Sequence, residues 1–481
     1  MKVRPDRLKS QEKSSSLLFC MAFFVIVFAA KVLLISNFGS SIPFWDQWDA
    51  QADFLYRPWI EGSARWMDLF VNHNEHRIFT TRALSLLLLY LNKGVWDPMF
   101  EMYVNAMLHT SALLFLLFLM QKGLQRGSKF AFFFFASLLF AVPYGHENTL
   151  AGFQSQFYFL LLFSFVFLWA IIRFHTAPQW WFPVLFFSAL LSYFSLASGA
   201  LTIAAGIGTL VIRWLCGIQR TRATLLLIIL LSFAFVTAIY FTPVMPHHAA
   251  LKAKSLPDFV IAIVRATGGG LLYIPVALFL IRHFQNSRSA TTHSWFVLAL
   301  CLWMTGQIFA VAYGRSSGIL SSRYLDLFAI GILLNGYCLF LMLQEEVSGK
   351  FFNSALLWFA LVIGGLGFFF PSIIKNIESK KAACLRNEDN VRGYLATGDP
   401  AFLQKAPYEE IPYPDATRLK SLLDQKAISS ILTPVVNSNN TRKGFGFYTD
   451  KSRKKMSVAG SMLLFYGISF FLFNTLKKKQ G

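Results

Sequence analysis

Charged residues are scarce in this chain of 481 residues, and acidic residues are the scarcest of them. Asp, Glu, Lys and Arg together make up 14% of the sequence, whereas 55% is hydrophobic. A soluble domain carries about 25% charged residues, so a large part of this surface does not face water. The composition therefore excludes an ordinary soluble enzyme and predicts a membrane protein.

Cysteine is also rare, with five residues in the whole chain. Cys20, Cys216, Cys301 and Cys338 lie in apolar stretches, and Cys384 stands alone in a polar segment. Their spacing matches no zinc motif and indicates no disulfide partners.

Acidic residues number 24 against 44 basic ones, which gives a net charge of +20. Proteins that bind nucleic acid gather such charge in a stripe or patch. Here the basic residues stand in short clusters between apolar runs, which is the pattern that orients membrane helices. We therefore expect no nucleic-acid partner.

Long apolar runs are what the sequence has in abundance, and they predict an all-α, multi-pass membrane protein that contacts the lipid bilayer. The first run follows a basic segment, as in a signal peptide, but the many later runs favour a first helix that is retained. The expected transmembrane helices, about twelve, are 17–36, 99–120, 130–144, 152–173, 180–196, 199–215, 224–242, 259–283, 293–313, 324–343, 351–371 and 457–476.

Basic clusters predict the direction of these helices. Positive residues before the first helix place the N-terminus in the cytoplasm. When the helices alternate in direction, every later cluster falls on the same side, so both termini are predicted to be cytoplasmic. The clusters are Lys2/Arg4/Arg7/Lys9/Lys13, Lys122/Arg126/Lys129, Arg213/Arg220/Arg222, Arg282/Arg288 and Lys477/Lys478/Lys479.

Two segments on the opposite side are longer than simple connections. The first, 37–98, contains an amphipathic run over 78–91 that is too short to cross a bilayer and is expected to lie on the outer face. The second, 372–456, is polar and rich in Lys, with a helical stretch near 416–428. The predicted organisation is a cytoplasmic N-terminus (1–16), a transmembrane core (17–371), an external domain (372–456) and a last helix with a cytoplasmic tail (457–481).

Acidic and aromatic residues meet at the start of the first outer segment, in the stretch Phe-Trp-Asp-Gln-Trp-Asp. Asp46 and Asp49 are three residues apart and would share one face of a helix. They are either reactive carboxylates or part of a solvated loop with an Asp at a helix N-cap, and spacing alone does not decide. Trp45 and Trp48 either line a site where water meets lipid or belong to the aromatic belt at the headgroup level.

A second polar cluster, Asn-His-Asn-Glu-His-Arg, follows at 72–77. His73, Glu75 and His76 are potential metal ligands, but their spacing matches no strong zinc motif, and ordinary hydrogen bonding is the commoner role of such residues. We therefore assign no metal site. A divalent metal is compatible with this segment but is not required by it.

Basic residues near the outer ends of later helices are candidates for anion binding. Arg315 and Arg323 flank a Ser/Gly loop, which forms either a cradle for phosphate or a pair of interface anchors. Arg265 lies in an otherwise apolar helix, where a cation is costly and marks a functional candidate. For Lys31, near the end of the first helix, snorkelling to the headgroups is a sufficient explanation.

A short loop after Pro143 adds further polar residues, namely Glu147 and Asn148 with Gln154 beyond them. These side chains either hydrogen-bond a polar substrate or cap a helix hairpin. The sequence leaves both alternatives open.

The layout as a whole resembles the type C (GT-C) glycosyltransferases: a cytoplasmic N-terminus, one helix, then a long outer loop that opens with acidic residues and carries surface helices. Within that superfamily, the Phe-Trp-Asp-Gln-Trp-Asp, His-Asn-Glu-His-Arg and Ser-Ser-Arg-Tyr stretches are similar to a bacterial and phage-borne group that includes the serotype-converting O-antigen glucosyltransferases. The aspartates here are separated by Gln47 and Trp48, unlike the common acidic pair, so either one is a candidate base.

The resemblance implies a hexosyltransferase that takes a sugar from a polyprenyl-phosphate carrier and gives it to a glycan acceptor, such as O-antigen lipopolysaccharide. It implies a bacterial inner-membrane location with the active site facing the periplasm. Asp46 or Asp49 would act as base, Arg315, Arg323 and Arg265 would contact the donor phosphate, and the acceptor or sugar pocket would be formed by Trp45, Trp48, His73, Glu75, His76, Arg77, Glu147, Asn148 and Gln154.

Three other functions are compatible with the sequence. A polytopic transporter or flippase for a lipid-linked or polar substrate is the main alternative, although the two halves of the chain show no internal repeat. A ligase that joins a lipid-linked glycan to another polymer would need a similar outer-face site. A non-catalytic scaffold would tolerate substitution of Asp46.

Overall fold

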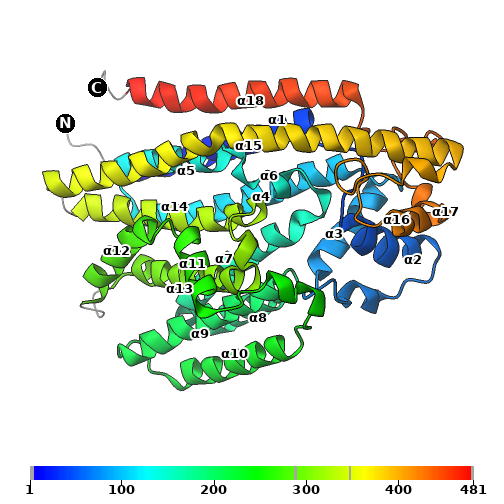
Figure 1. The fold of residues 1–481 in the computed structure, drawn as a ribbon. Coiled ribbons are helices and arrows are strands. Elements are labelled where there is room, and N and C mark those ends of the chain that lie inside the picture. Colours follow the sequence, from blue (N-terminus) through cyan, green and yellow to red (C-terminus); the bar gives the residue numbers. More distant parts are fainter. Residues whose placement is uncertain (1–4, 286–289, 346–347, 478–481) are drawn as a thin grey trace.

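The computed structural model describes residues 5–285, 290–345 and 348–477, and this part of the chain is all-helical, without β-strands (Figure 1). Five of the basic residues used to orient the helices lie outside the described residues. They are Lys2, Arg4, Arg288, Lys478 and Lys479.

Among the described residues, nine helices are long and apolar enough to cross a membrane, and a bent pair raises the number to ten if it forms one span. The nine are α1 (Pro5–Phe38), α4 (Pro98–Met120), α5 (Arg126–Ala141), α7 (Ser155–Arg173), α9 (Ala200–Leu215), α10 (Arg222–Tyr240), α13 (Thr292–Gly314), α14 (Ser322–Glu345) and α15 (Gly349–Thr397). The pair is α11 (Leu256–Ala266) and α12 (Ile274–Phe284), bent by 57°. A multi-pass helical membrane protein is thereby confirmed.

Two of the twelve expected spans are helical but are not among these ten. The range 180–196 falls on α8 (Pro178–Tyr193), which has 16 residues. The helices α5 and α9 are equally short, but each continues into short helices that extend the apolar span to Arg126–Thr149 and Ala197–Leu215. The range 457–476 falls on α18 (Asp450–Lys477), which packs along α1. The number twelve stays a prediction.

Apolar helices suit this environment because each satisfies its own backbone hydrogen bonds without water. Their packing brings α1 against α4, α5 and α18, and α7 against α4 and α8. Phenylalanine rings fill much of the interior, as where Phe19 stacks on Phe471 with 6.5 Å between ring centroids. On the outside, α10 and α15 leave most of their apolar residues exposed, which fits contact with lipid.

The helix α15 is the longest element, with 49 residues, and it passes the boundary predicted at residue 371 without a break. Pro371 lies inside it, and Gly398 ends it with a left-handed φ of +74°. The segment 372–456 therefore begins as a continuation of a membrane helix, and its later part contains α16 (Ala416–Leu423) and α17 (Lys426–Ser429), at the predicted helical stretch.

The first outer segment and the later part of the second fold together at one end of the molecule, which we call the polar end (Figure 1). Their shared core includes Trp48, Trp96, Leu419 and Ile428. The helices of the first outer segment are the π-helix η1 (Gln47–Tyr56), α2 (Arg57–Ile60), η2 (Trp66–Phe70) and α3 (Phe79–Leu91). Another short helix, α6 (His146–Thr149), lies between α5 and α7 in the chain. The two outer segments thus form one unit on the end of the bundle.

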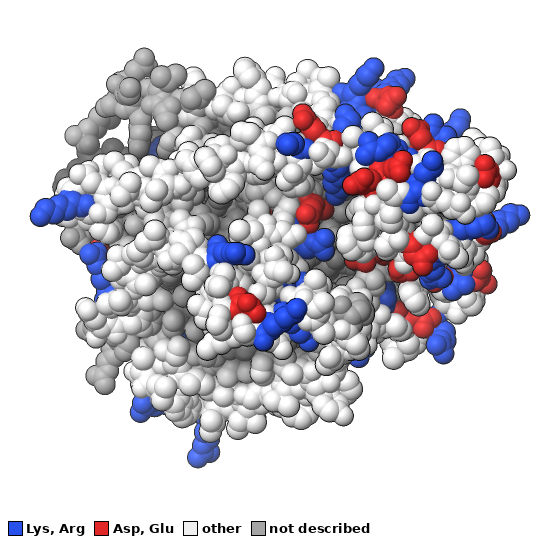
Figure 2. Space-filling model, viewed as in Figure 1, with Lys and Arg blue, Asp and Glu red and all other residues white. Residues whose placement is uncertain are grey.

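Charged side chains are densest at the polar end, and fewer of them lie over the middle of the bundle on the face shown (Figure 2). The C-terminal end of α18 and the N-terminal end of α1 lie at the opposite end (Figure 1). This distribution is the one expected for a protein whose middle is surrounded by lipid.

Candidate functional site

A buried carboxylate of α4 holds the start of the first outer segment in place by hydrogen bonds. Glu101 accepts hydrogen bonds from Gln47 (3.1 Å) and Gln51 (2.8 Å), both on η1. The Tyr56 hydroxyl donates a third, at 3.0 Å. Because the glutamines point inward, Asp46, which precedes Gln47, and Asp49, which lies between the two glutamines, are turned toward the surface of the unit.

Trp48 is part of the core of this unit. Its indole is completely buried, packs edge-on against Trp96 and donates to the Pro43 carbonyl at 3.0 Å. No face of the ring is available to a sugar or to lipid headgroups. The predicted ligand-binding role of Trp48 is therefore replaced by a structural one.

Asp49 is engaged by the second outer segment. The Tyr413 hydroxyl donates to it at 2.6 Å, and Arg418 forms an ion pair with it at 3.3 Å. Arg418 also pairs with Asp53, one turn further along η1. Asp49 therefore joins the two outer segments.

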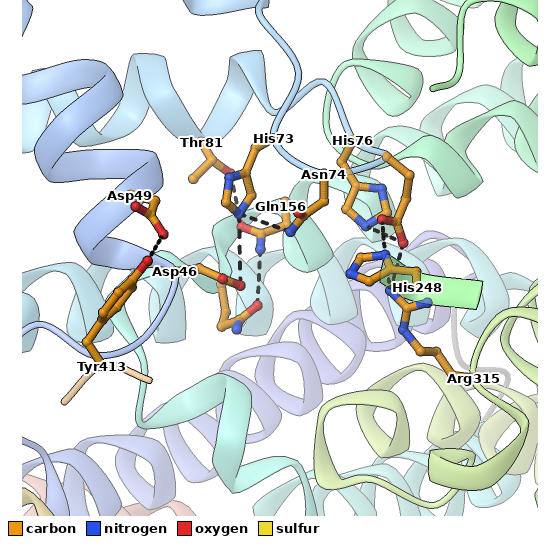
Figure 3. Close-up of polar contacts among 12 residues, drawn as sticks. Asp46, Asp49, His73, Asn74, His76, Thr81, Gln156, His248, Arg315 and Tyr413 are labelled. Carbon is orange, nitrogen blue, oxygen red and sulfur yellow. Dashed lines mark hydrogen bonds and ion pairs between the residues drawn. The ribbon is translucent and has the colours of Figure 1, made fainter. Parts of the chain in front are cut away.

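Asp46 differs from Asp49 in its surroundings. Its side chain is 38% exposed and points toward His73, with 3.9 Å between a carboxylate oxygen and Nε2, whereas Asp49 points away toward Tyr413 (Figure 3). His73 in turn packs edge-on against Phe153. Asp46 is thus a carboxylate that solvent or a ligand can reach.

An exposed aromatic pair lies directly beside Asp46. Trp45 is 40% exposed and stacks on Tyr408, with ring centroids 4.5 Å apart. Its φ of +52° is unusual for a bulky residue, and such conformations are concentrated at functional sites. A hydrogen bond from its backbone N–H to the Pro412 carbonyl (2.9 Å) helps to hold it there.

Two cations adjoin the aromatic pair. The Arg323 guanidinium lies 5.9 Å from the Trp45 ring centroid and pairs with Glu147 at 3.1 Å. The Lys380 ammonium, from the extension of α15, lies 5.5 Å from the Phe44 ring and interacts electrostatically with both Arg323 and Glu147. Two cations, Arg323 and Lys380, therefore lie beside the aromatic pair, and both interact with Glu147.

Asn148 holds the backbone of Arg323 in place. Its side-chain amide is completely buried and donates to the Arg323 carbonyl at 2.8 Å and to Asp326 at 3.1 Å. Both groups face the interior, so Asn148 orders the start of α14 and is not placed to bind a substrate.

Arg315 lies in a separate cluster with the other predicted residues of the first outer segment. It pairs with Glu75 at 2.8 Å, and His248 approaches the same carboxylate at 2.8 Å (Figure 3). The charge of Arg315 is therefore already compensated within the protein, which disfavours the predicted phosphate contact. We call Glu75, His76, His248 and Arg315 the ion cluster.

Burial and charge set the ionisation of this cluster. Burial alone would raise the pKa of Glu75, but its histidine neighbours and Arg315 lower it to about 2. Burial lowers the pKa of His76 to about 4. A neutral His76 agrees with its hydrogen bond, because its Nδ1 accepts the backbone N–H of Ala197 at 3.3 Å.

The His-Asn-Glu-His stretch is a tight turn. His73 and His76 exchange two backbone hydrogen bonds, of 2.8 and 3.0 Å, and Asn74 adopts a left-handed φ of +51°, which asparagine tolerates. The turn directs His73 toward Asp46, and it directs His76 toward His248 and Arg315 (Figure 3).

Three more predicted residues lie apart from the Asp46 region or serve the backbone around it. Arg77 donates to the carbonyls of Phe70 (3.0 Å) and Phe241 (3.4 Å), so it holds the loop in place. Gln154 accepts a hydrogen bond from Gln156 at 3.1 Å. Arg265 is exposed in the last turn of α11, and within the described ranges no hydrogen bond or ion pair joins it to either group of residues.

Lys31 also differs from the sequence expectation. It is only 7% exposed, and its ammonium donates to Thr149 at 3.2 Å and interacts electrostatically with the buried Asp326. His109 is completely buried nearby, and neither ring nitrogen has a hydrogen-bond partner. Lys31 thus points into a polar interior and does not snorkel.

Several residues of the site were not predicted from the sequence: His248, Lys380, Tyr408, Tyr413 and Arg418. The aromatic and acidic run at 407–413 was a usable signal for two of them. Among the described residues, no group of three or more His, Cys, Asp or Glu side chains is placed to hold a metal ion.

Comparisons with protein-family models, with curated proteins and with solved structures find no match to this chain.

Proposed function

We propose that the chain is an inverting glycosyltransferase of the bacterial inner membrane, which moves a hexose from a polyprenyl-phosphate carrier to a cell-surface glycan at the periplasmic face. The observation that carries the proposal is the combination at the polar end: a reachable carboxylate, Asp46, beside the exposed Trp45–Tyr408 pair and the cations Arg323 and Lys380.

Each of these groups has a role in such a transfer. Asp46 takes the proton from the acceptor hydroxyl as its oxygen attacks the anomeric carbon of the sugar. The bond between that carbon and the phosphate oxygen breaks, and the electron pair leaves with the polyprenyl phosphate. Arg323 and Lys380 stabilise the negative charge on this leaving group, which needs no general acid. The aromatic pair offers a flat surface for a sugar ring.

This assignment narrows the set predicted from the sequence. Asp46 is preferred to Asp49 as base because Asp49 is already hydrogen-bonded and ion-paired. Arg323 with Lys380 is preferred to Arg315 with Arg265 because these two cations lie at the Trp45 and Phe44 rings, beside Asp46. Arg315 belongs to the separate ion cluster, and no contact joins Arg265 to the Asp46 region within the described ranges. His73 is the neighbour placed to orient Asp46.

The test compares Asp46→Asn and Asp49→Asn with wild type in membranes that contain equal amounts of folded protein. The donor is polyprenyl-phosphate glucose, and the acceptor is isolated O-antigen lipopolysaccharide. We expect Asp46→Asn to lower transfer by a factor of about 100 to 10,000, the usual contribution of a positioned base. We expect Asp49→Asn to lower thermal stability and to retain transfer per folded molecule. Full transfer by folded Asp46→Asn would refute the assignment of the base.

Transport or flipping of a lipid-linked or polar substrate is the second candidate, and the buried group of Lys31, His109 and Asp326 favours it. Ionisable residues inside a membrane commonly mark the path of a substrate or ion. Proteoliposomes that carry a fluorescent polyprenyl-phosphate sugar on one leaflet distinguish the two functions. Movement between leaflets that is lost in Asp326→Asn and kept in Asp46→Asn would favour transport.

A further inference from the structure

An open cavity of about 800 Å³ lies between α1 and α4, toward the end of the bundle that is opposite the polar end. Its walls are mainly apolar and include Leu17, Leu114 and Phe118. Leu17 is 63% exposed and Phe118 is 48% exposed, so the cavity opens onto the side of the bundle. Its size is within the range of about 300–1,000 Å³ that is typical of ligand sites.

The charged groups of this lining lie in one part of it, after the end of α4 and at the start of α5. Lys122 and Lys129 both border the cavity, and Lys129 is only 7% exposed although lysine is almost always exposed. The Lys122 ammonium lies 4.9 Å from the centre of the Phe118 ring, so it sits over the apolar wall. The Lys122 ammonium at one end of an apolar cavity favours a ligand with a negative group at one end of an apolar body.

Gln121 gives an independent indication of a ligand. Its side chain is 5% exposed and borders the cavity, and its amide nitrogen donates to the Cys20 sulfur at 3.6 Å. Its amide oxygen is buried and has no hydrogen-bond partner. A buried acceptor without a donor costs about 1–3 kcal/mol, so a hydroxyl group of the ligand would remove this penalty.

We propose that this cavity binds one phospholipid with a negatively charged, hydroxyl-bearing headgroup, of which phosphatidylglycerol is the type. The acyl chain lies along Leu17, Leu114 and Phe118. The phosphate lies against Lys122, and a headgroup hydroxyl donates to Gln121. The site is independent of the proposed transfer reaction, because it lies at the opposite end of the bundle.

The test uses the purified full chain with equal molar amounts of phosphatidylglycerol, phosphatidylmethanol and phosphatidylcholine in mixed micelles, and counts retained lipids by native mass spectrometry. We expect wild type to retain phosphatidylglycerol best, because phosphatidylmethanol has no headgroup donor for Gln121 and phosphatidylcholine lacks the net charge. Lys122→Gln should lower retention of both anionic lipids at least fivefold. Gln121→Leu should remove only the preference for phosphatidylglycerol over phosphatidylmethanol.

Lys350→Gln is the matched control, since it removes one exposed positive charge at the start of α15 and should leave retention unchanged. Phe118→Trp fills the cavity without altering its charges and should also lower retention, so the test does not depend on a lysine variant that folds poorly. Equal retention of the three lipids by wild type would overturn the proposal. So would an equal loss in Lys350→Gln and Lys122→Gln.

Discussion

Within the five residues from Trp45 to Asp49, burial separates side chains of the same type. Trp48 is completely buried and holds the core, whereas Trp45 is 40% exposed and faces Tyr408 and Arg323. Asp49 is ion-paired, whereas Asp46 is open on one side. The inward-pointing Gln47 causes this division, because its bond to Glu101 fixes which way η1 faces. Chemistry at the residue scale therefore depends on one buried hydrogen-bond network.

The ion cluster predicts a loss of stability in acid. An unfolded His76 binds a proton below a pH of about 6.5, whereas the folded one does so only near its pKa of about 4. Stability should therefore fall as the pH drops from 6.5 to 4. Because the pKa of Glu75 is about 2, a further loss follows below 4.5. The midpoint of thermal unfolding, followed by tryptophan fluorescence between pH 7.5 and 2.5, measures both losses.

The control for this prediction is His76→Gln, which keeps a hydrogen-bond acceptor but does not titrate. Its unfolding midpoint should change less than that of wild type between pH 6.5 and 4.5. Identical curves for the two proteins would show that another group causes the acid response.

At the scale of elements, α18 lies against α1 because glycines allow a close approach. A Cβ atom at Gly467 would be 2.5 Å from the side chain of Ile26, and one at Gly460 would be 3.0 Å from Leu33. Small residues commonly let membrane helices pack closely. Near the start of α18, Arg453 donates a hydrogen bond to the carbonyl of Gly39 at 2.9 Å, just beyond the end of α1. The last helix, α18, is therefore held against α1 by close packing at its glycines and by a hydrogen bond near its N-terminal end.

Gly467→Val should weaken this pair of helices. The added side chain has no room against Ile26, and overpacking of this kind costs about 1–3 kcal/mol. Gly365→Val is the matched control, because a Cβ atom there meets nothing within 4 Å. Thermal unfolding in the same detergent should show a lower midpoint for Gly467→Val alone. Equal midpoints in the two variants would contradict the close packing.

At the scale of the whole molecule, the arrangement of the helices predicts which segments share a side of the membrane. In a background without cysteine, Ser63→Cys and Lys443→Cys should react with a membrane-impermeant maleimide from one side of sealed vesicles. Ala223→Cys, at the start of α10 near the opposite end, should react only from the other side. Labelling of all three from one side would show that the bundle does not cross the membrane as inferred.

The sequence was sufficient for most of the fold, because an apolar run of membrane length has few alternatives to a helix. The site was only partly predictable. The ion pair between Arg315 and Glu75 joins residues 240 positions apart, and the bond between Tyr413 and Asp49 joins residues 364 apart. Neither leaves a periodic pattern in the sequence. Residue type and the predicted side of the membrane were enough to name Asp46, His73 and Arg323 as candidates. Only the fold shows which of their neighbours are already hydrogen-bonded or ion-paired.

The unbroken α15 gives the molecule a mechanical connection between its two environments. A helix of 49 residues is about 70 Å long. One part of it packs among the membrane helices, and the other part extends beyond them to the polar end. A change of about 5° in the tilt of α15 would displace one of its ends by several ångströms relative to the other. Lys380, which lies on α15, and the Tyr408 loop would move with that end. Because Trp45 and the Tyr408 loop belong to one packed unit, a change in bilayer thickness would be transmitted to the position of that unit relative to the other membrane helices, with Pro371 as the place where α15 can bend.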